Sequence, residues 1–107
     1  MQLATWNVNS LKVRLGHVQD WLRSNPVDVL CLQELKLTDE NFPITEIAAL
    51  GYTSHFTGQK TYNGVAMLVN HAKVGEATDL VKNLPNFADE QQRLITATIG
   101  GVRVVCG

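Results

Sequence analysis

The spacing of apolar positions in the first third of the chain predicts a strand, a helix and a second strand. The short apolar run at 3–8 is typical of a buried strand. Apolar residues then recur at helical spacing through 11–22, and either Asn9 or Ser10 can cap that helix. The near-continuous apolar run at 27–32 predicts a central strand that is covered on both faces.

A second helix and two more strands are predicted in the middle of the chain. Pro43 suits the first position of a helix over 44–50, and Gly51 suits its end. The alternating segment 52–57 predicts a half-buried strand, and the apolar segment 65–69 predicts a buried one.

The last third of the chain is predicted to end in a hairpin. A short strand is expected at 74–78 and a surface loop at 84–92. Strands at 93–99 and 102–106 are joined by Gly100-Gly101, a favoured two-residue turn.

Length, charge and composition predict a soluble, ordered protein of one domain. The chain has 107 residues, of which 45% are hydrophobic, enough for one core. Its net charge of −1 argues against a protein whose whole surface binds nucleic acid or a charged membrane. The first residues lack the pattern of a signal peptide, and no run approaches the ~20 apolar residues of a membrane span. A cytoplasmic location is expected.

The cysteines and histidines are expected to be structural. Cys31 and Cys106 lie in apolar runs and are interpreted as small buried hydrophobes, with a disulfide between them left open. His17, His55 and His71 show no paired metal-ligand spacing.

The two tryptophans, Trp6 and Trp21, are expected in the core rather than as platforms on which bases stack. No glycine-rich phosphate loop, nucleophile elbow or Cys-x-x-Cys pair is present in the sequence.

Two polar residues follow the first two predicted strands. Parallel strands joined by a helix end at the same sheet edge, where ligands bind in open α/β folds. Asn7 and Glu34 are therefore expected to meet there, in an oxygen-rich setting that suits Mg²⁺. On spacing alone, a helix cap for Asn7 and a solvated Glu34 are the more common outcomes.

Three short motifs occur in the order and separation of a known enzyme family. They are Trp6-Asn7-Val8-Asn9-Ser10-Leu11, Leu32-Gln33-Glu34-Leu35-Lys36 and Asn63-Gly64-Val65-Ala66. In combination, and over essentially all 107 residues, the chain resembles the amino-terminal half of the exonuclease III family of apurinic/apyrimidinic endonucleases, within the endonuclease/exonuclease/phosphatase superfamily.

The resemblance implies the fold and its extent. It implies the amino-terminal half of a four-layered α/β sandwich, with one mixed β-sheet and flanking helices, and a partial domain over 1–107 that is truncated at its carboxyl end. The family's Tyr-x-Pro, Asp-x-Asn and Ser-Asp-His elements would lie beyond Gly107. The inner sheet face would then be bare and apolar, so self-association through it is expected.

The resemblance also implies the site residues. Asn7 and Glu34 would be catalytic and would hold the metal ion, with Asn9 and Lys36 supporting them from behind. DNA contacts would come from Lys12, Arg14, Lys60, Tyr62 and Asn63. Arg93 is left open between a DNA contact and a structural salt bridge.

The implied function is that of a Mg²⁺-dependent DNA-repair nuclease, with Mn²⁺ as the alternative ion. Its partner would be double-stranded DNA with abasic sites or 3′ ends. The 107-residue chain alone is expected to be inactive, because catalytic residues that act as a unit are not additive. Two alternatives stay open: a non-catalytic half-domain with a DNA-binding or assembly role, and a superfamily relative that acts on RNA or another phosphodiester.

Overall fold

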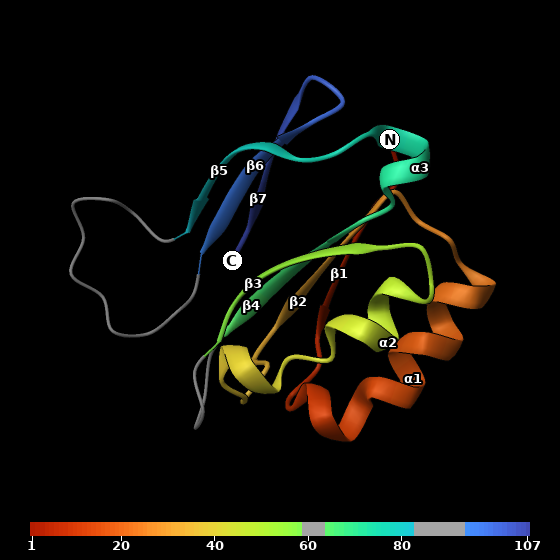
Figure 1. Ribbon diagram of the computed structural model, residues 1–107, viewed down its shortest axis with the longest axis vertical. Helices are drawn as coiled ribbons and strands as arrows, with labels where there is room; N and C mark the ends of the chain where they lie inside the picture. The colour runs from red at the N-terminus through yellow and green to blue at the C-terminus, as the bar shows by residue number, and fades with distance from the viewer. Residues whose placement is uncertain (59–63, 83–93) are drawn as a thin grey trace.

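Three layers make up the part of the molecule that the computed structural model describes, residues 1–58, 64–82 and 94–107. A four-stranded sheet lies between two helices and a three-stranded sheet (Figure 1). In chain order the elements are β1 (Leu3–Asn7), α1 (Leu11–Ser24), β2 (Val29–Gln33), the 3-10 helix η1 (Asp39–Asn41), α2 (Ile44–Ala48), β3 (Thr53–Thr57), β4 (Val65–Val69), α3 (His71–Val74), β5 (Thr78–Lys82), β6 (Ile95–Ile99) and β7 (Val102–Cys106).

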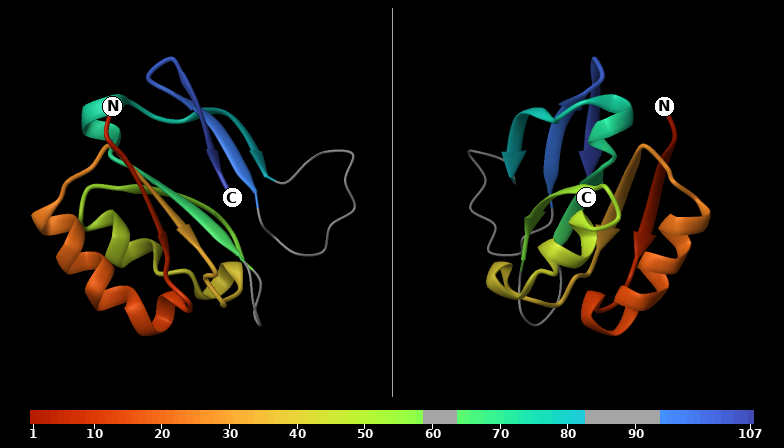
Figure 2. Two further views of the ribbon diagram at one scale, coloured as in Figure 1. Left: turned by 180° about the vertical axis from the view of Figure 1, so that it is seen from behind. Right: turned by 45° about the vertical axis from the view of Figure 1, so that its right-hand side comes forward.

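The larger sheet is mixed and the smaller one is antiparallel. The larger sheet has the order β1-β2-β4-β3, in which β1 and β2 are parallel and the other pairs are antiparallel. The smaller sheet has the order β5-β6-β7. Figure 2 shows α1 and α2 on one side of the larger sheet and the smaller sheet on the other.

Both central strands of the larger sheet are buried on two faces. Leu30 and Leu32 of β2 belong to the core beneath the helices, whereas Val29 and Cys31 belong to the core between the sheets. Strand β4 alternates in the same way, and all five of its residues are buried. Two-sided burial explains why these strands appear in the sequence as near-continuous apolar runs.

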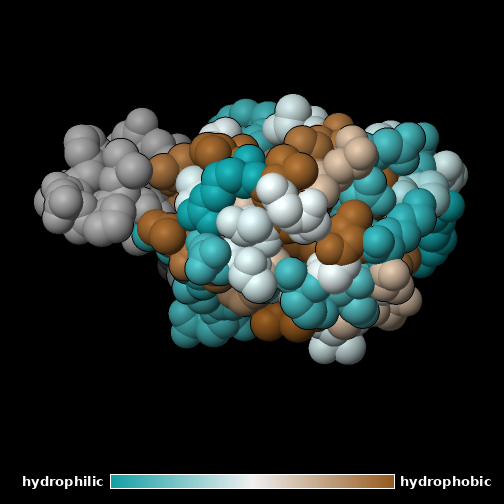
Figure 3. Space-filling view, turned by 90° about the horizontal axis from the view of Figure 1, so that it is seen from above, coloured by the Kyte–Doolittle hydropathy of each residue, from teal (hydrophilic) through white to brown (hydrophobic). Residues whose placement is uncertain are grey.

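The mixed α/β class and most predicted elements are confirmed. The expectation of one sheet with a bare inner face is wrong, because Ile95, Ile99 and Val104 of the smaller sheet pack on that face. Seen from above, hydrophobic residues form separate patches between hydrophilic ones (Figure 3). Self-association stays a prediction, but it no longer has the bare inner face to support it.

The strand predicted at 74–78 is also wrong. The short helix α3 takes in Val74, and the backbone carbonyl of Asn70 accepts hydrogen bonds from the amides of Lys73 and Val74. The strand starts only at Thr78, and its residues are mostly exposed. An exposed edge strand has no buried face, so it lacks the apolar alternation from which strands are predicted.

Two details of the turns can be compared with the sequence. Gly100 and Gly101 have φ values of 55° and 79°, the left-handed pair that a tight hairpin turn requires, so the predicted hairpin is confirmed. Ser10 occupies the N-cap position of α1, but its side chain makes no capping hydrogen bond.

No helix within the described residues is both long enough and apolar enough to span a membrane.

A substitution at Leu68 tests the packing of the core between the larger sheet and the helices. The fully buried Leu68 lies on β4, whereas Leu3 on β1 is 54% exposed. We expect Leu68→Ala to lower the free energy of unfolding by about 2–5 kcal/mol, because it leaves a cavity among fixed neighbours. The matched Leu3→Ala should change it by less than ~1 kcal/mol. Urea unfolding measures both, and equal effects would contradict this packing.

Candidate functional site

Backbone hydrogen bonds join the segments that follow β1 and β2. The amide of Val8 donates to the carbonyl of Gln33 at 3.1 Å. The amides of Ser10 and Leu11 donate to the carbonyls of Glu34 and Leu35, each at 2.9 Å. The parallel pairing therefore continues beyond the two strands and fixes the side chains at this edge relative to one another.

Asn7 and Glu34 meet at this edge, as the topology predicted. The Asn7 Nδ2 donates a hydrogen bond to Glu34 Oε2. The Asn7 Oδ1 accepts a hydrogen bond from the Asn9 amide at 3.1 Å. Asn7 thus bridges the turn after β1 and the carboxylate after β2, and its side chain does not cap α1.

Lys36 and Asn9 form a second cross-connection beside this pair. The Lys36 Nζ donates to Asn9 Oδ1 at 2.5 Å. A chain of hydrogen bonds therefore runs from Glu34 through Asn7 and Asn9 to Lys36. Four of the predicted site residues lie in one connected network, and their roles in catalysis and metal binding stay predictions.

The backbone under this network adopts left-handed conformations. Asn9, Glu34 and Lys36 have φ values of 46°, 54° and 54°, which are uncommon for residues other than glycine. Conformations of this kind cost roughly 1–3 kcal/mol each and gather at functional sites. Buried Leu35 and Leu37 anchor the turn, so Glu34 and Lys36 alternate with them toward the surface.

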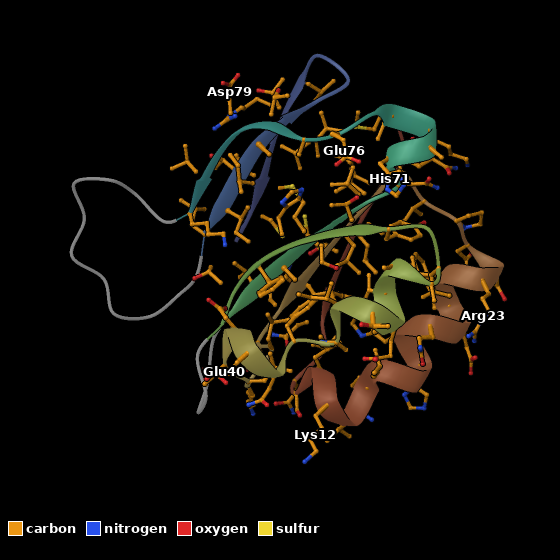
Figure 4. All side chains as sticks on the ribbon, viewed as in Figure 1. Lys12, Arg23, Glu40, His71, Glu76 and Asp79 are labelled. Atoms are coloured by element: carbon orange, nitrogen blue, oxygen red, sulfur yellow. The ribbon has the colours of Figure 1, made fainter. Side chains whose placement is uncertain are left out.

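A groove next to the network places two cations together. Lys12 and Lys36 both line a groove of about 570 Å³, together with Ser10, Leu15, Leu37, Thr38, Asn41, Pro43 and Glu46. Lys12 points outward from the start of α1 (Figure 4). Arg14, also predicted to contact DNA, is half-buried on α1 and does not line this groove.

Lys60, Tyr62, Asn63 and Arg93 lie outside the described residues. Gly58 and Gly64, which flank 59–63, are described, and each forms a hydrogen bond with the segment after Glu34.

Gly58 and Gly64 are held by that segment in different ways. The Gly58 amide donates to Asp39 Oδ1 at 2.6 Å, and the Leu35 amide donates to the Gly64 carbonyl at 3.2 Å. Sequence reasoning missed Asp39, since nothing in the sequence distinguishes it from other surface carboxylates.

The histidines lie apart from the network. His17 is exposed on α1, and His71 on α3 pairs with Thr53 at 2.8 Å at the opposite end of the sheet. Burial holds the pKa of His55 below its ordinary value, because it disfavours the charged ring. Among the described residues, no group of three or more His, Cys, Asp or Glu side chains could hold a metal ion.

The tryptophans pack where the sequence predicted. Trp6 and Trp21 meet edge to face, with ring centroids 6.3 Å apart, against the core beneath the helices. Both residues are partly buried against that core, on the side that the sequence predicted.

Comparison with protein families identifies the chain. Residues 4–107 match the Endonuclease/Exonuclease/phosphatase family. The chain belongs to this family. Among curated proteins, it is 32% identical over 100 residues to exodeoxyribonuclease III of Haemophilus influenzae, an alignment that covers 92% of this chain and 36% of that protein.

Solved structures of nucleases share the fold. The 3′-5′ exonuclease NExo of Neisseria meningitidis matches with a TM-score of 0.90 and 46% identity over 98% of this chain and 40% of that one. An AP endonuclease of Archaeoglobus fulgidus matches with a TM-score of 0.89 and 37% identity, over 98% and 39% of the two chains. The chain thus spans well under half the length of these relatives.

A substitution at Gly58 tests how closely this residue packs against the backbone of the segment after Glu34. A Cβ there would overlap the Leu37 carbonyl oxygen and lie 3.0 Å from the Asp39 amide nitrogen. We expect Gly58→Ala to lower the free energy of unfolding by about 1–3 kcal/mol. Gly16→Ala is the control, since nothing lies within 4 Å of its Cβ and alanine favours the helix by up to ~1 kcal/mol. Thermal unfolding compares them, and an unchanged Gly58→Ala midpoint would contradict the contact.

Proposed function

We propose that this chain is the amino-terminal part of a divalent-metal-dependent DNA-repair nuclease that hydrolyses phosphodiesters at abasic sites and at 3′ ends. The hydrogen bond from the Asn7 amide to the Glu34 carboxylate carries this proposal. It brings two residues of the family's motifs together at the sheet edge where ligands bind in open α/β folds.

The side chains at this edge fit a hard divalent cation. Glu34 offers the one carboxylate of the network, and the side chains hydrogen-bonded around it are amides and an ammonium group. Mg²⁺ commonly takes one or two carboxylates and keeps water and phosphate as its other ligands. Glu34 would hold the ion, with Mg²⁺ as the proposed species and Mn²⁺ as the alternative.

The chain's own residues would orient that carboxylate and bind the substrate backbone. Asn7 holds one oxygen of Glu34, and Lys36 holds Asn9, which fixes the turn after β1. When bound, a divalent ion supplies Lewis-acid polarisation of a phosphodiester. These hydrogen bonds would keep the carboxylate in one orientation, as supporting partners of metal ligands generally do.

Double-stranded DNA is the proposed partner. Lys12 and Lys36 face one groove, so their charges can act on neighbouring phosphates. Arg14, Lys60, Tyr62 and Asn63 are proposed as further contacts on the basis of the family's motifs. A net charge of −1 means that such binding depends on this local arrangement rather than on the whole surface.

The names of the relatives describe two kinds of DNA substrate. The Neisseria protein is described as a 3′-5′ exonuclease, and also as a 3′ phosphatase bound to a product DNA hairpin. The Archaeoglobus protein is described as an AP endonuclease. Both 3′-end processing and abasic-site incision therefore belong in the proposal, and a functional test needs both substrates.

The proposed location is the cytoplasm.

Metal binding is tested with a pair of carboxylate variants. We expect saturating Mg²⁺ or Mn²⁺ to raise the midpoint of thermal unfolding, because a ligand that binds only the folded state stabilises it. Glu34→Gln should abolish this shift. Glu40→Gln, on the exposed η1 helix, should retain it. An equal shift in Glu34→Gln would place the ion elsewhere.

Hydrolysis is tested on duplexes with one abasic-site analogue or one 3′-phosphate, with Mg²⁺ and with EDTA. We expect no cleavage by the 107-residue chain above a Glu34→Ala preparation, because the described residues bring together no group of three metal-ligating side chains and catalytic residues that act as a unit are not additive. A longer protein that carries this sequence should cleave these duplexes with Mg²⁺ and not with EDTA.

In that longer protein, Glu34→Ala should reduce the rate by about 100-fold or more, a larger loss than a supporting partner of a ligand usually causes. Full activity of Glu34→Ala in the longer protein would overturn the proposed role of Glu34. Metal-dependent cleavage by the 107-residue chain itself, lost in Glu34→Ala, would contradict the expected inactivity and support the site.

A further inference from the structure

Two cysteines lie in the core between the sheets, outside the proposed site. Cys31 lies on β2 and Cys106 on β7, and both face the core between the two sheets. Both are free, with 8% and 1% of their surfaces exposed. The Cys106 thiol donates a hydrogen bond to the Ala66 carbonyl at 3.2 Å, and Ala66 pairs with Leu32, the chain neighbour of Cys31. Two cysteines 75 positions apart in the chain therefore lie close together between the sheets.

A cavity gives small molecules a route to this pair. Both cysteines line a cavity of about 310 Å³ between the edge strands β1 and β7. Leu3 and Val105 also line it, and they are 54% and 62% exposed, so the cavity reaches the surface. A solute the size of a hydroperoxide fits into this space.

The surroundings make the two thiols chemically unequal. Cys31 is 8% exposed and Cys106 only 1%, so Cys31 is the thiol that a solute in the cavity reaches more easily. The neighbouring Cys106 side chain holds the pKa of Cys31 below its ordinary value, against the effect of burial, whereas Cys31 and burial hold the pKa of Cys106 above its ordinary value. Cys31 is therefore assigned as the nucleophile, since thiolates are the reactive form.

We propose that Cys31 and Cys106 form an oxidisable dithiol that a hydroperoxide converts into a disulfide between the two sheets. In the first step, the Cys31 thiolate attacks one peroxide oxygen, the O–O bond breaks, and Cys31 becomes a sulfenic acid as hydroxide leaves. In the second step, the Cys106 sulfur attacks the Cys31 sulfur. The S–S bond forms, the S–O bond breaks, and the Cys106 proton and the departing hydroxide give water.

The crosslink would join the last described strand to the strand that leads to the proposed site. Cys31 is three residues before Glu34, and Gln33 lines the same cavity as both cysteines. A disulfide here closes a long loop, which stabilises the folded state by restricting the unfolded chain. The proposal rests on the cavity and the core that the two cysteines share, and not on the proposed nuclease function.

Peptide mapping of the 107-residue chain after treatment with hydrogen peroxide tests the inference. We expect the monomer to lose the mass of two hydrogen atoms and to resist alkylation by N-ethylmaleimide in denaturant. Trypsin should release peptide 24–36 linked to peptide 104–107, and dithiothreitol should separate them. Urea unfolding of the oxidised chain should shift to higher denaturant and return after reduction.

Cys31→Ala and Cys106→Ala are the controls, and each should show neither the mass loss nor the shift. Sulfinic acid at Cys31 without a crosslink would overturn the proposal, as would disulfides only between chains or two thiols that remain alkylatable. If either variant fails to fold, the peptide map of the unsubstituted chain is sufficient to decide between these outcomes.

Discussion

Burial of β2 and β4 on both faces is the constraint on which the other layers depend. Each strand presents alternate residues to the helices and to the smaller sheet, so one pair of strands supplies the centre of two cores. Leu30 and Leu68 can be buried only if α1 and α2 cover one face, and Val29 and Met67 only if β6 and β7 cover the other. The apolar side chains of two strands thereby specify a three-layered arrangement.

The same strands position the polar site. Parallel pairing of β1 with β2 brings Asn7 and Glu34 to one edge, and the backbone bonds beyond the strands keep them there. The left-handed conformations at Glu34 and Lys36 cost free energy, which burial of Leu35 and Leu37 offsets. A turn that alternates buried anchors with outward polar groups holds the Glu34 carboxylate in one place on the surface, which suits the role proposed for it.

The core between the sheets has a polar side. Cys31, Gln33 and Cys106 line one cavity there, behind the turn that carries Glu34. The Gln33 side chain donates to Thr5 Oγ1 at 2.8 Å, so β2 is also connected to the edge strand β1 at this level of the sandwich. Packing between the sheets and geometry at the site edge are therefore linked through β2.

The sequence by itself determined the elements that bury a recognisable face. The apolar runs of β2 and β4, the helical spacing of α1 and the Gly100-Gly101 hairpin were all predictable, because local periodicity and turn chemistry encode them. It also predicted, from strand order alone, that Asn7 and Glu34 would meet. Only the tertiary structure decided the second sheet, the edge strand β5 and helix α3. It alone revealed the Asp39–Gly58 bond and the cavity that Cys31 and Cys106 share. The packing of the second sheet, the Asp39–Gly58 bond and the shared cavity involve residues distant in the chain. The sequences of β5 and α3 carry no periodic apolar signal of their own, so the surrounding structure selects them.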